Sequence, residues 1–298
     1  MNWKLVARAP KRVVQAALAA HEALDEWDPD IVLTGSEVAQ ERPDEWVLEA
    51  YLPRKPRPAD YEAVVALFGP AGPALATEEV PDTDWVAETQ RLTEPIRAGR
   101  FHVHTPDFAA DPQAVDLVIP AAQAFGTGQH ATTAGCLLML DTMKRRGVVV
   151  RNLADIGTGT GLLAFATLRL WPGTRAIASD IDAVCEPVVA ENARLNAVRL
   201  GAAPGELAMV VAEGFDHPLL ADRAPYDLVI ANILAGPLIA LAGDFADAVA
   251  PRGHLLLAGL LTTQQPAVRT ACRIAGFRLA ARLVNGDWSI LWLRRRSA

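Results

Sequence analysis

Strand-like and helix-like segments alternate repeatedly in the second half of the 298-residue chain. An apolar run is followed by a helical pattern three times: residues 152–156 and 162–170, 175–180 and 183–199, and 226–231 and 235–249. Such alternation is typical of a parallel sheet covered by helices. Two further strands, expected over residues 277–284 and 288–294, are joined by a short turn, which predicts an antiparallel hairpin at the end of the sheet.

The first eighty residues follow a different pattern. Strand-like runs at residues 3–9, 31–38, 45–52 and 74–80 alternate with helical runs at 11–24 and 59–68. The order strand, helix, strand, strand, helix, strand is that of a ferredoxin-like α+β domain. An acidic, polar stretch follows and predicts a connector with some helix in it. We therefore expect a small domain over residues 1–76, a linker over 77–99 and a larger domain over 100–298.

Composition narrows the classes of function. No run approaches the roughly 18 apolar residues of a membrane span, and the N-terminus lacks the apolar core of a secretion signal, so we expect a cytoplasmic protein without a membrane partner. The cysteines Cys136, Cys185 and Cys272 are far apart, so neither a disulfide framework nor a zinc cluster is indicated. A formal net charge of −7 argues against direct nucleic-acid binding and is compatible with a basic partner.

Three alternate glycines mark the first strand-to-helix turn of the larger domain. Gly157, Gly159 and Gly161 let the backbone turn tightly and approach a ligand without hindrance from a Cβ atom. Dinucleotide enzymes normally space these glycines as Gly-x-Gly-x-x-Gly, whereas the tighter spacing leaves room for an amino-acid and ribose moiety. The spacing favours S-adenosylmethionine, although a turn without a ligand could use the same glycines.

Two polar residues stand at the ends of later strands. Asp180 can accept hydrogen bonds from both hydroxyls of a ribose, while Asp182 is expected to cap the following helix. Asn232 stands at the carboxyl end of a parallel strand, where ligands bind such sheets, and its amide oxygen can accept a hydrogen bond from an amine. The alternative for Asn232 is the N-cap of the next helix.

A second glycine-rich loop, residues 124–133, opens a helix expected to reach residue 144 and could fold over the cofactor. Thr132 and Thr133 bring hydroxyls to the start of this helix. Phe125 offers an aromatic face to a sulfonium cation, and His130 is a titratable side chain near the cleft. We expect Phe125 to contact the cofactor, and either His130, in a catalytic role as a weak base, or bulk water to take the proton from the amine.

Four segments together resemble the PrmA methyltransferases, which modify ribosomal protein L11. They are residues 125–133, 155–161, 180–182 and 232–238, and residues 84–86 and 94–97 resemble the linker of that family. The resemblance spans the C-terminal two thirds, and the N-terminal third matches in layout only. Gln129 and Ala131 depart from the threonine and proline expected in that loop.

The resemblance implies a class I methyltransferase fold, Rossmann-like, with a mostly parallel sheet that ends in an antiparallel hairpin. The cofactor contacts of the family fall on Thr133, Gly157, Asp180 and Asn232, to which we add Gly159 from the loop. It also implies that the N-terminal domain recognises the substrate protein, and that lysine side chains or the N-terminal α-amine of ribosomal protein L11 accept the methyl groups.

Other functions would require different residues in these motifs. A dehydrogenase should show the wider glycine spacing, and an adenine-modifying enzyme should show an aromatic residue after Asn232 to stack the base. A methyltransferase acting on another protein or on a small molecule stays open, as does a binding module without catalysis.

His102 and His104 alternate along an expected strand and share a face, but no third ligand stands at a suitable spacing. We therefore expect a structural role for the two histidines and no metal. The arginines at 294–296 are expected to be a solvated tail.

Overall fold

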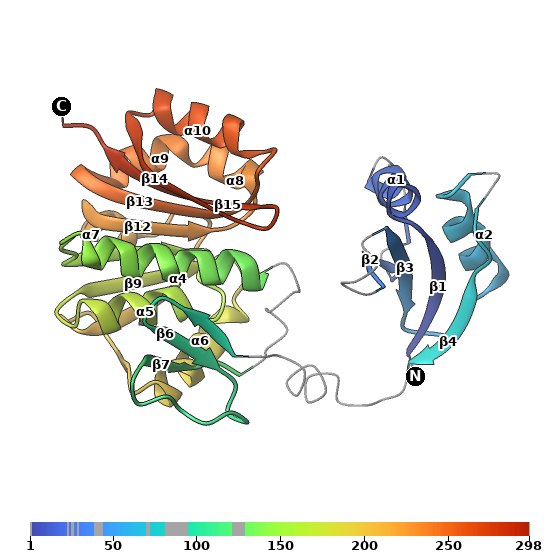
Figure 1. The fold of residues 1–298 in the computed structure, drawn as a ribbon, viewed down its shortest axis with the longest axis horizontal. Helices are drawn as coiled ribbons and strands as arrows, with labels where there is room; N and C mark the ends of the chain where they lie inside the picture. Colours follow the sequence, from blue (N-terminus) through green and yellow to red (C-terminus); the bar gives the residue numbers. More distant parts are fainter. Residues whose placement is uncertain are drawn as a thin grey trace. The chain divides into compact units, whose positions relative to one another are not determined.

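The computed structural model describes residues 2–22, 24, 27–28, 30–38, 44–69, 72–80, 95–120 and 129–297. It divides into two compact units, Met1–Glu88 and Thr89–Ala298 (Figure 1). Within the described residues, none of the helices combines the length and the apolar character needed to cross a membrane. Of the linker expected over residues 77–99, residues 81–94 lie outside the described residues, whereas residues 77–80 and 96–98 belong to strands.

The smaller unit has the strand and helix order that the sequence predicts. It contains β1 (Asn2–Pro10), α1 (Lys11–Glu22), β2 (Val32–Glu37), β3 (Glu45–Leu52), α2 (Pro58–Ala66) and β4 (Ala76–Val80). The strands form an antiparallel sheet in the order β2-β3-β1-β4. Alternate residues of the central strands, such as Leu5 and Leu48, are buried against Val14 of α1 and Val64 of α2. One core therefore joins both helices to the sheet.

The larger unit is built on an eight-stranded sheet. Its order is β10 (Arg199–Leu200), β11 (Glu206–Val211), β9 (Arg175–Asp180), β8 (Asn152–Ile156), β12 (Tyr226–Asn232), β13 (Val249–Leu261), β15 (Trp288–Arg295) and β14 (Phe277–Asn285). Neighbours from β10 to β13 pair in parallel, whereas β15 pairs antiparallel with both β13 and β14. This mostly parallel sheet with an antiparallel end confirms the predicted class I methyltransferase fold.

Helices cover both faces of this sheet, and each face has its own core. The first core takes side chains from α4 (Gln129–Arg145), α5 (Leu162–Leu170) and α6 (Cys185–Leu195), and the second from α7 (Pro218–Arg223), α8 (Ala235–Ala240), α9 (Ala242–Ala248) and α10 (Gln265–Ile274). Successive strand residues alternate between them, so Leu153 belongs to the first core and Ala154 to the second. Burial on both faces explains why the parallel strands are continuous apolar runs.

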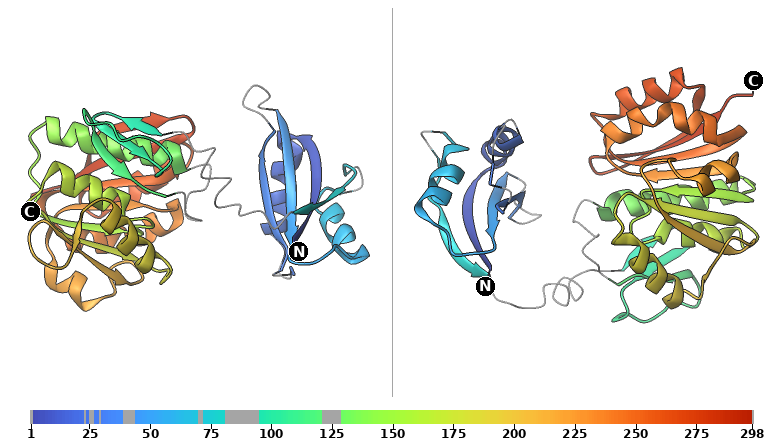
Figure 2. Two further views of the ribbon diagram at one scale, coloured as in Figure 1. Left: turned by 90° about the horizontal axis from the view of Figure 1, so that it is seen from below. Right: turned by 180° about the vertical axis from the view of Figure 1, so that it is seen from behind.

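A second, three-stranded sheet belongs to the same unit. β5 (Ile96–Ala98) pairs antiparallel with β6 (Phe101–His104), and β6 pairs in parallel with β7 (Val115–Val118). These strands, teal in Figure 2, lie beside α4 and α5. The side chain of Asn196, just after α6, accepts a hydrogen bond from the Val118 N–H (2.9 Å) and donates one to the Val118 carbonyl (2.7 Å). The small sheet is therefore fixed to the larger one.

Two expected helices differ in the structure. The helix expected over residues 183–199 is α6, and it ends at Leu195 because Ala197 takes a positive φ of 50°, which starts a new direction of the chain. The helix expected over 235–249 is divided into α8 and α9 at Leu241, whose φ of −78° and ψ of 2° depart from helical geometry.

Candidate functional site

The glycine turn between β8 and α5 forms one wall of the site. Gly157, Gly159 and Gly161 all take positive φ values, of 69°, 56° and 83°. The N–H groups of Gly157 and Thr158 both donate to the carbonyl of Ser179 on β9, at 2.8 and 2.9 Å. The turn is thereby held against the end of the neighbouring strand. A Cβ atom on Gly159 would meet no atom within 4 Å, so the backbone there faces open space.

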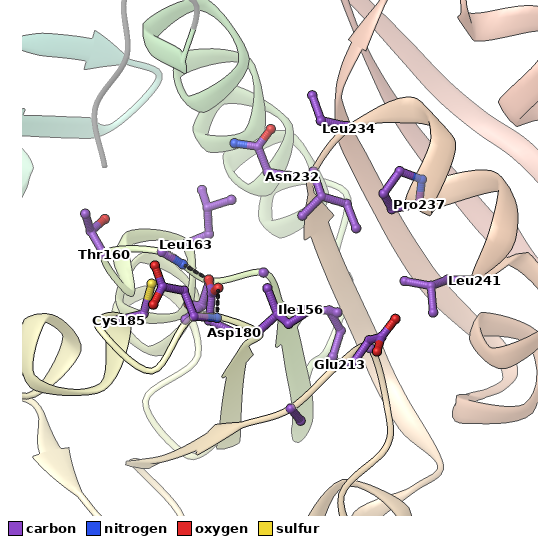
Figure 3. Close-up of a pocket in the computed structure, with 18 of the residues that line it drawn as sticks. Ile156, Thr160, Leu163, Asp180, Cys185, Glu213, Asn232, Leu234, Pro237 and Leu241 are labelled. Atoms are coloured by element: carbon purple, nitrogen blue, oxygen red, sulfur yellow. Dashed lines mark hydrogen bonds between the residues drawn. The ribbon is translucent and has the colours of Figure 1, made fainter. Parts of the chain in front are cut away.

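Asp180 ends β9 next to this turn. Its carboxylate accepts the N–H of Gly159 at 2.9 Å and the N–H of Asp182 at 3.1 Å (dashed in Figure 3). The carboxylate of Asp182 accepts the N–H of Val184 at 3.0 Å, in the turn that leads into α6. Because charge-assisted bonds fix Asp180 from two sides, its remaining lone pairs have a set direction.

Asp155, at the end of β8, lies beneath the turn and was not expected to carry a role. It is 1% exposed, and burial raises the pKa of its carboxyl to about 7. The hydroxyl of Thr158 donates to it at 2.7 Å. Asp155 therefore supports the turn from below, while Asp180 holds it from the side.

Asn232 ends β12, across the cavity from Asp180 (Figure 3). The helix that follows begins at Ala235, and its N-cap residue is Leu234. Asn232 is therefore not the N-cap of this helix, which was the alternative role for it. Within the part of the chain that the structure describes, the amide of Asn232 has no hydrogen-bond partner. Its donor and acceptor groups are available to a ligand.

These segments enclose one cavity of about 760 Å³ at the carboxyl ends of the parallel strands. Its lining includes Thr133, Gly157, Gly159, Asp180 and Asn232, which brings together every described residue that the sequence predicts to bind the cofactor. Such volumes and this position at the sheet edge are usual for sites that take cofactors. Phe125 lies outside the described residues, as does the side chain of His130, whose backbone belongs to α4.

The cavity also contains side chains that sequence reasoning missed. Ile181 and Leu234 stand at its mouth with 69% and 72% of their surface exposed, although both are apolar. Glu213 follows β11, and Leu241 reaches the cavity from the break between α8 and α9. Cys185 faces Asp180 (Figure 3), and burial together with that carboxylate raises the pKa of its thiol to about 11. Being a neutral thiol near pH 7, it is not a nucleophile.

A glycine turn, an acidic strand end and a polar strand end, set at the carboxyl edge of a sheet of this order, define the chain as a class I S-adenosylmethionine-dependent methyltransferase. A solved structure described as a ribosomal protein L11 methylase, from Lactobacillus delbrueckii subsp. bulgaricus, shares the fold. It has a TM-score of 0.55 and 24% identity, and the match covers 68% of this chain and 98% of that one.

Sequence comparison gives the family. The model of the family "Ribosomal protein L11 methyltransferase (PrmA)" matches residues 15–296. A ribosomal protein L11 methyltransferase of Agrobacterium fabrum is 38% identical over 272 residues, which cover 90% of each chain. One from Mesorhizobium japonicum is 40% identical over 240 residues, covering 80% of this chain and 79% of the relative. The chain belongs to the ribosomal protein L11 methyltransferase (PrmA) family, as the resemblance in its motifs predicts.

Proposed function

We propose that this chain transfers methyl groups from S-adenosylmethionine to amines of ribosomal protein L11. The observation that carries the proposal is the convergence of Gly159, Asp180 and Asn232 on one cavity in a chain of this family. Relatives that match along most of the chain bear the name of this activity. A ribosomal protein as partner fits the cytoplasmic location expected from the sequence, without a membrane or a direct nucleic-acid partner.

The lining of the cavity suits the separate parts of the cofactor. The open backbone beside Gly159 admits the methionine portion, with Thr133 beside it, and Asp180 is placed to accept the ribose hydroxyls. The apolar side chains of Ile181 and Leu241 suit the faces of the adenine ring. The carboxylate of Glu213 can accept a hydrogen bond from its amino group.

When bound, the cofactor supplies an electrophilic methyl group on a sulfonium. The substrate amine forms a nitrogen–carbon bond to this methyl as the sulfur–carbon bond breaks, and the nitrogen then releases a proton. A lysine amine has a pKa of about 10.4 in water, so the site has to favour the neutral amine. An apolar lining does so by disfavouring the charged form, and the amide oxygen of Asn232 orients the nitrogen by accepting its hydrogen.

The titratable groups near the cavity differ in whether they can accept the proton that the amine releases. The raised pKa of Cys185, about 11, leaves it protonated, and Asp155 is engaged with Thr158 and does not line the cavity. We propose His130, at the start of α4, or bulk water as the acceptor.

A labelling experiment tests the proposed function. The purified chain is incubated with methyl-labelled S-adenosylmethionine and either purified ribosomal protein L11 or a cell extract. We expect label on lysine side chains or on the N-terminal amine of L11, located by mass spectrometry. Label on a different protein or on a small molecule, with none on L11, would favour the alternative substrate. Tight binding of NAD without binding of S-adenosylmethionine would contradict the proposal altogether.

We further propose that residues 1–76 recognise the substrate protein. All described residues that line the cavity belong to the larger unit, and each unit has its own apolar core. A chain that begins at Val80 should therefore fold and bind S-adenosylmethionine by calorimetry, yet lose most methylation of intact L11. A free lysine peptide serves as the control substrate. Full methylation of L11 by the shortened chain would place recognition in the larger unit.

A further inference from the structure

A second cluster of polar side chains lies away from the cavity, on the three-stranded sheet. The parallel register of β6 and β7 sets His102 opposite Asp116, and His104 stands two residues further along the same face. The two imidazole rings stack with their centroids 4.9 Å apart and both reach the same carboxylate. His102 Nδ1 lies 2.7 Å from Asp116 Oδ1, and His104 Nε2 lies 3.0 Å from Asp116 Oδ2. The structure thus supplies the third group that the sequence spacing did not.

The contacts of His104 require either a proton or a metal ion between its ring and Asp116. Its Nδ1 lies 2.7 Å from the carbonyl of Thr105, which can only accept, so Nδ1 carries a hydrogen. In the neutral ring Nε2 then has a lone pair, and this lone pair faces an oxygen of Asp116. Two acceptors at 3.0 Å repel each other unless a cation lies between them. That cation is either a proton or a metal ion.

The surroundings favour a metal ion. A backbone carbonyl that accepts the second N–H of an imidazole is the usual way in which proteins orient a histidine ligand, and Thr105 does this for His104. The side chains of His102 and His104 are 4% and 3% exposed, which excludes competing water from the two nitrogens. Asp116 is 21% exposed, so an ion has access and one coordination position can hold water.

The distances between the ligand atoms and the negative charge of Asp116 are also compatible with a metal ion. One ligand atom from each residue can be chosen so that all three lie within 4.8 Å of one another. Around a tetrahedral zinc ion with bonds of about 2.0–2.2 Å, two ligand atoms lie about 3.3–3.6 Å apart, so the histidine–carboxylate distances of 2.7 and 3.0 Å have to widen by less than about 1 Å for an ion to enter. The N–H of Asp111 donates to Asp116 at 2.9 Å and stabilises its ionised form.

We propose that His102, His104 and Asp116 bind a divalent metal ion of the zinc class, which joins β6 to β7. Two imidazoles and one carboxylate are ligands that zinc and its neighbours in the first transition series accept. The site is separate from the cofactor cavity, whose described lining includes none of the three residues. The proposal is therefore independent of the substrate of the enzyme.

The test uses the untagged full chain, stripped with a chelator and then titrated with Zn²⁺ or Co²⁺. We expect one ion per chain after dialysis by elemental analysis, a visible absorption band for the Co²⁺ form, and a higher melting temperature with Zn²⁺. Asp116→Asn should weaken the binding about 100-fold or more, since it removes the charged ligand. Asp107→Asn, which changes an exposed aspartate of the same segment, is the matched control and should bind as the wild type does.

Nitrogen NMR of histidine-labelled wild type decides the question even if Asp116→Asn does not fold. We expect the Zn²⁺ titration to shift His104 Nε2 and His102 Nδ1, while His104 Nδ1 keeps its hydrogen. Absence of stoichiometric binding, with the ring of His104 doubly protonated, would overturn the proposal and identify the cation as a proton. Equal binding by wild type and a folded Asp116→Asn variant would also overturn it, because the ion would then lie elsewhere.

Discussion

Exchange of Asp180 for asparagine tests the assignment of the ribose-binding residue. The carboxylate accepts N–H groups from Gly159 and Asp182 in the free protein, so it both holds the glycine turn and remains available to the cofactor. The amide of asparagine keeps one acceptor oxygen but turns a donor toward the second position. At least one hydrogen bond to a charged acceptor is therefore lost, which costs about 1.5–3 kcal/mol.

This free energy corresponds to a rise of about 10- to 150-fold in the dissociation constant of S-adenosylmethionine. Calorimetry measures it directly, and circular dichroism checks that the variant is folded. Asp182→Asn is the comparison variant: Asp182 also lines the cavity, but its carboxylate already accepts the N–H of Val184, and asparagine replaces aspartate well in such turns. We expect it to change the affinity by less than about threefold. A larger loss of affinity in Asp182→Asn than in Asp180→Asn would show that the two assignments are reversed.

Three further predictions follow from the same site and its sheet. Asn232→Ala should lower kcat more than tenfold, by about 1.4 kcal/mol or more, with little change in melting temperature, because it removes the group that orients the amine; an unchanged kcat would leave Asn232 without that role. Gly157→Ala should lower the melting temperature more than Gly159→Ala, because only the first Cβ collides with Ile233, whereas Gly159→Ala should weaken cofactor binding more; thermal melts and calorimetry on both variants check the order. Acidification from about pH 7 to about pH 5 should destabilise the wild type more than His254→Gln. Burial lowers the pKa of His254 to about 4, so in this range the unfolded chain takes up a proton that the folded chain does not; equal slopes of stability against pH would contradict this.

Much of the larger unit could be predicted because its signals are local. β8, α5 and β9 have the bounds expected from the sequence, since each is an apolar run that ends at or shortly before glycine, proline or aspartate. β13 was missed because it contains Pro251 and Gly253, which usually indicate a turn. In the structure its pairing passes from Val249 directly to His254, and the residues between them bulge out, with Arg252 at a φ of 65°.

Other parts of the larger unit have a weak local signal or depend on contacts between distant segments. α10 was missed because only Gln265, Val268 and Cys272 are buried among its ten residues, which leaves a narrow apolar face. The cluster of His102, His104 and Asp116 was missed for a different reason. Its third member becomes a neighbour only when β6 and β7 pair in parallel, and a spacing rule along the chain does not detect that pairing.

The position of Asn232 also depends on a feature that no local pattern reveals. The next residue, Ile233, passes between two glycines that belong to neighbouring segments of the sheet. A Cβ atom on Gly157 would collide with the side chain of Ile233, and one on Gly259 would lie 2.8 Å from its carbonyl carbon and 2.9 Å from its nitrogen. Both glycines take positive φ values, of 69° and 81°. Gly157 belongs to the expected cofactor motif, but Gly259 stands in an apolar run and looks like part of an ordinary strand. Since the two close approaches fix the backbone on either side of Ile233, they also fix the direction of the amide of Asn232. Gly157, which opens the cofactor loop, therefore also aligns the group proposed to hold the amine.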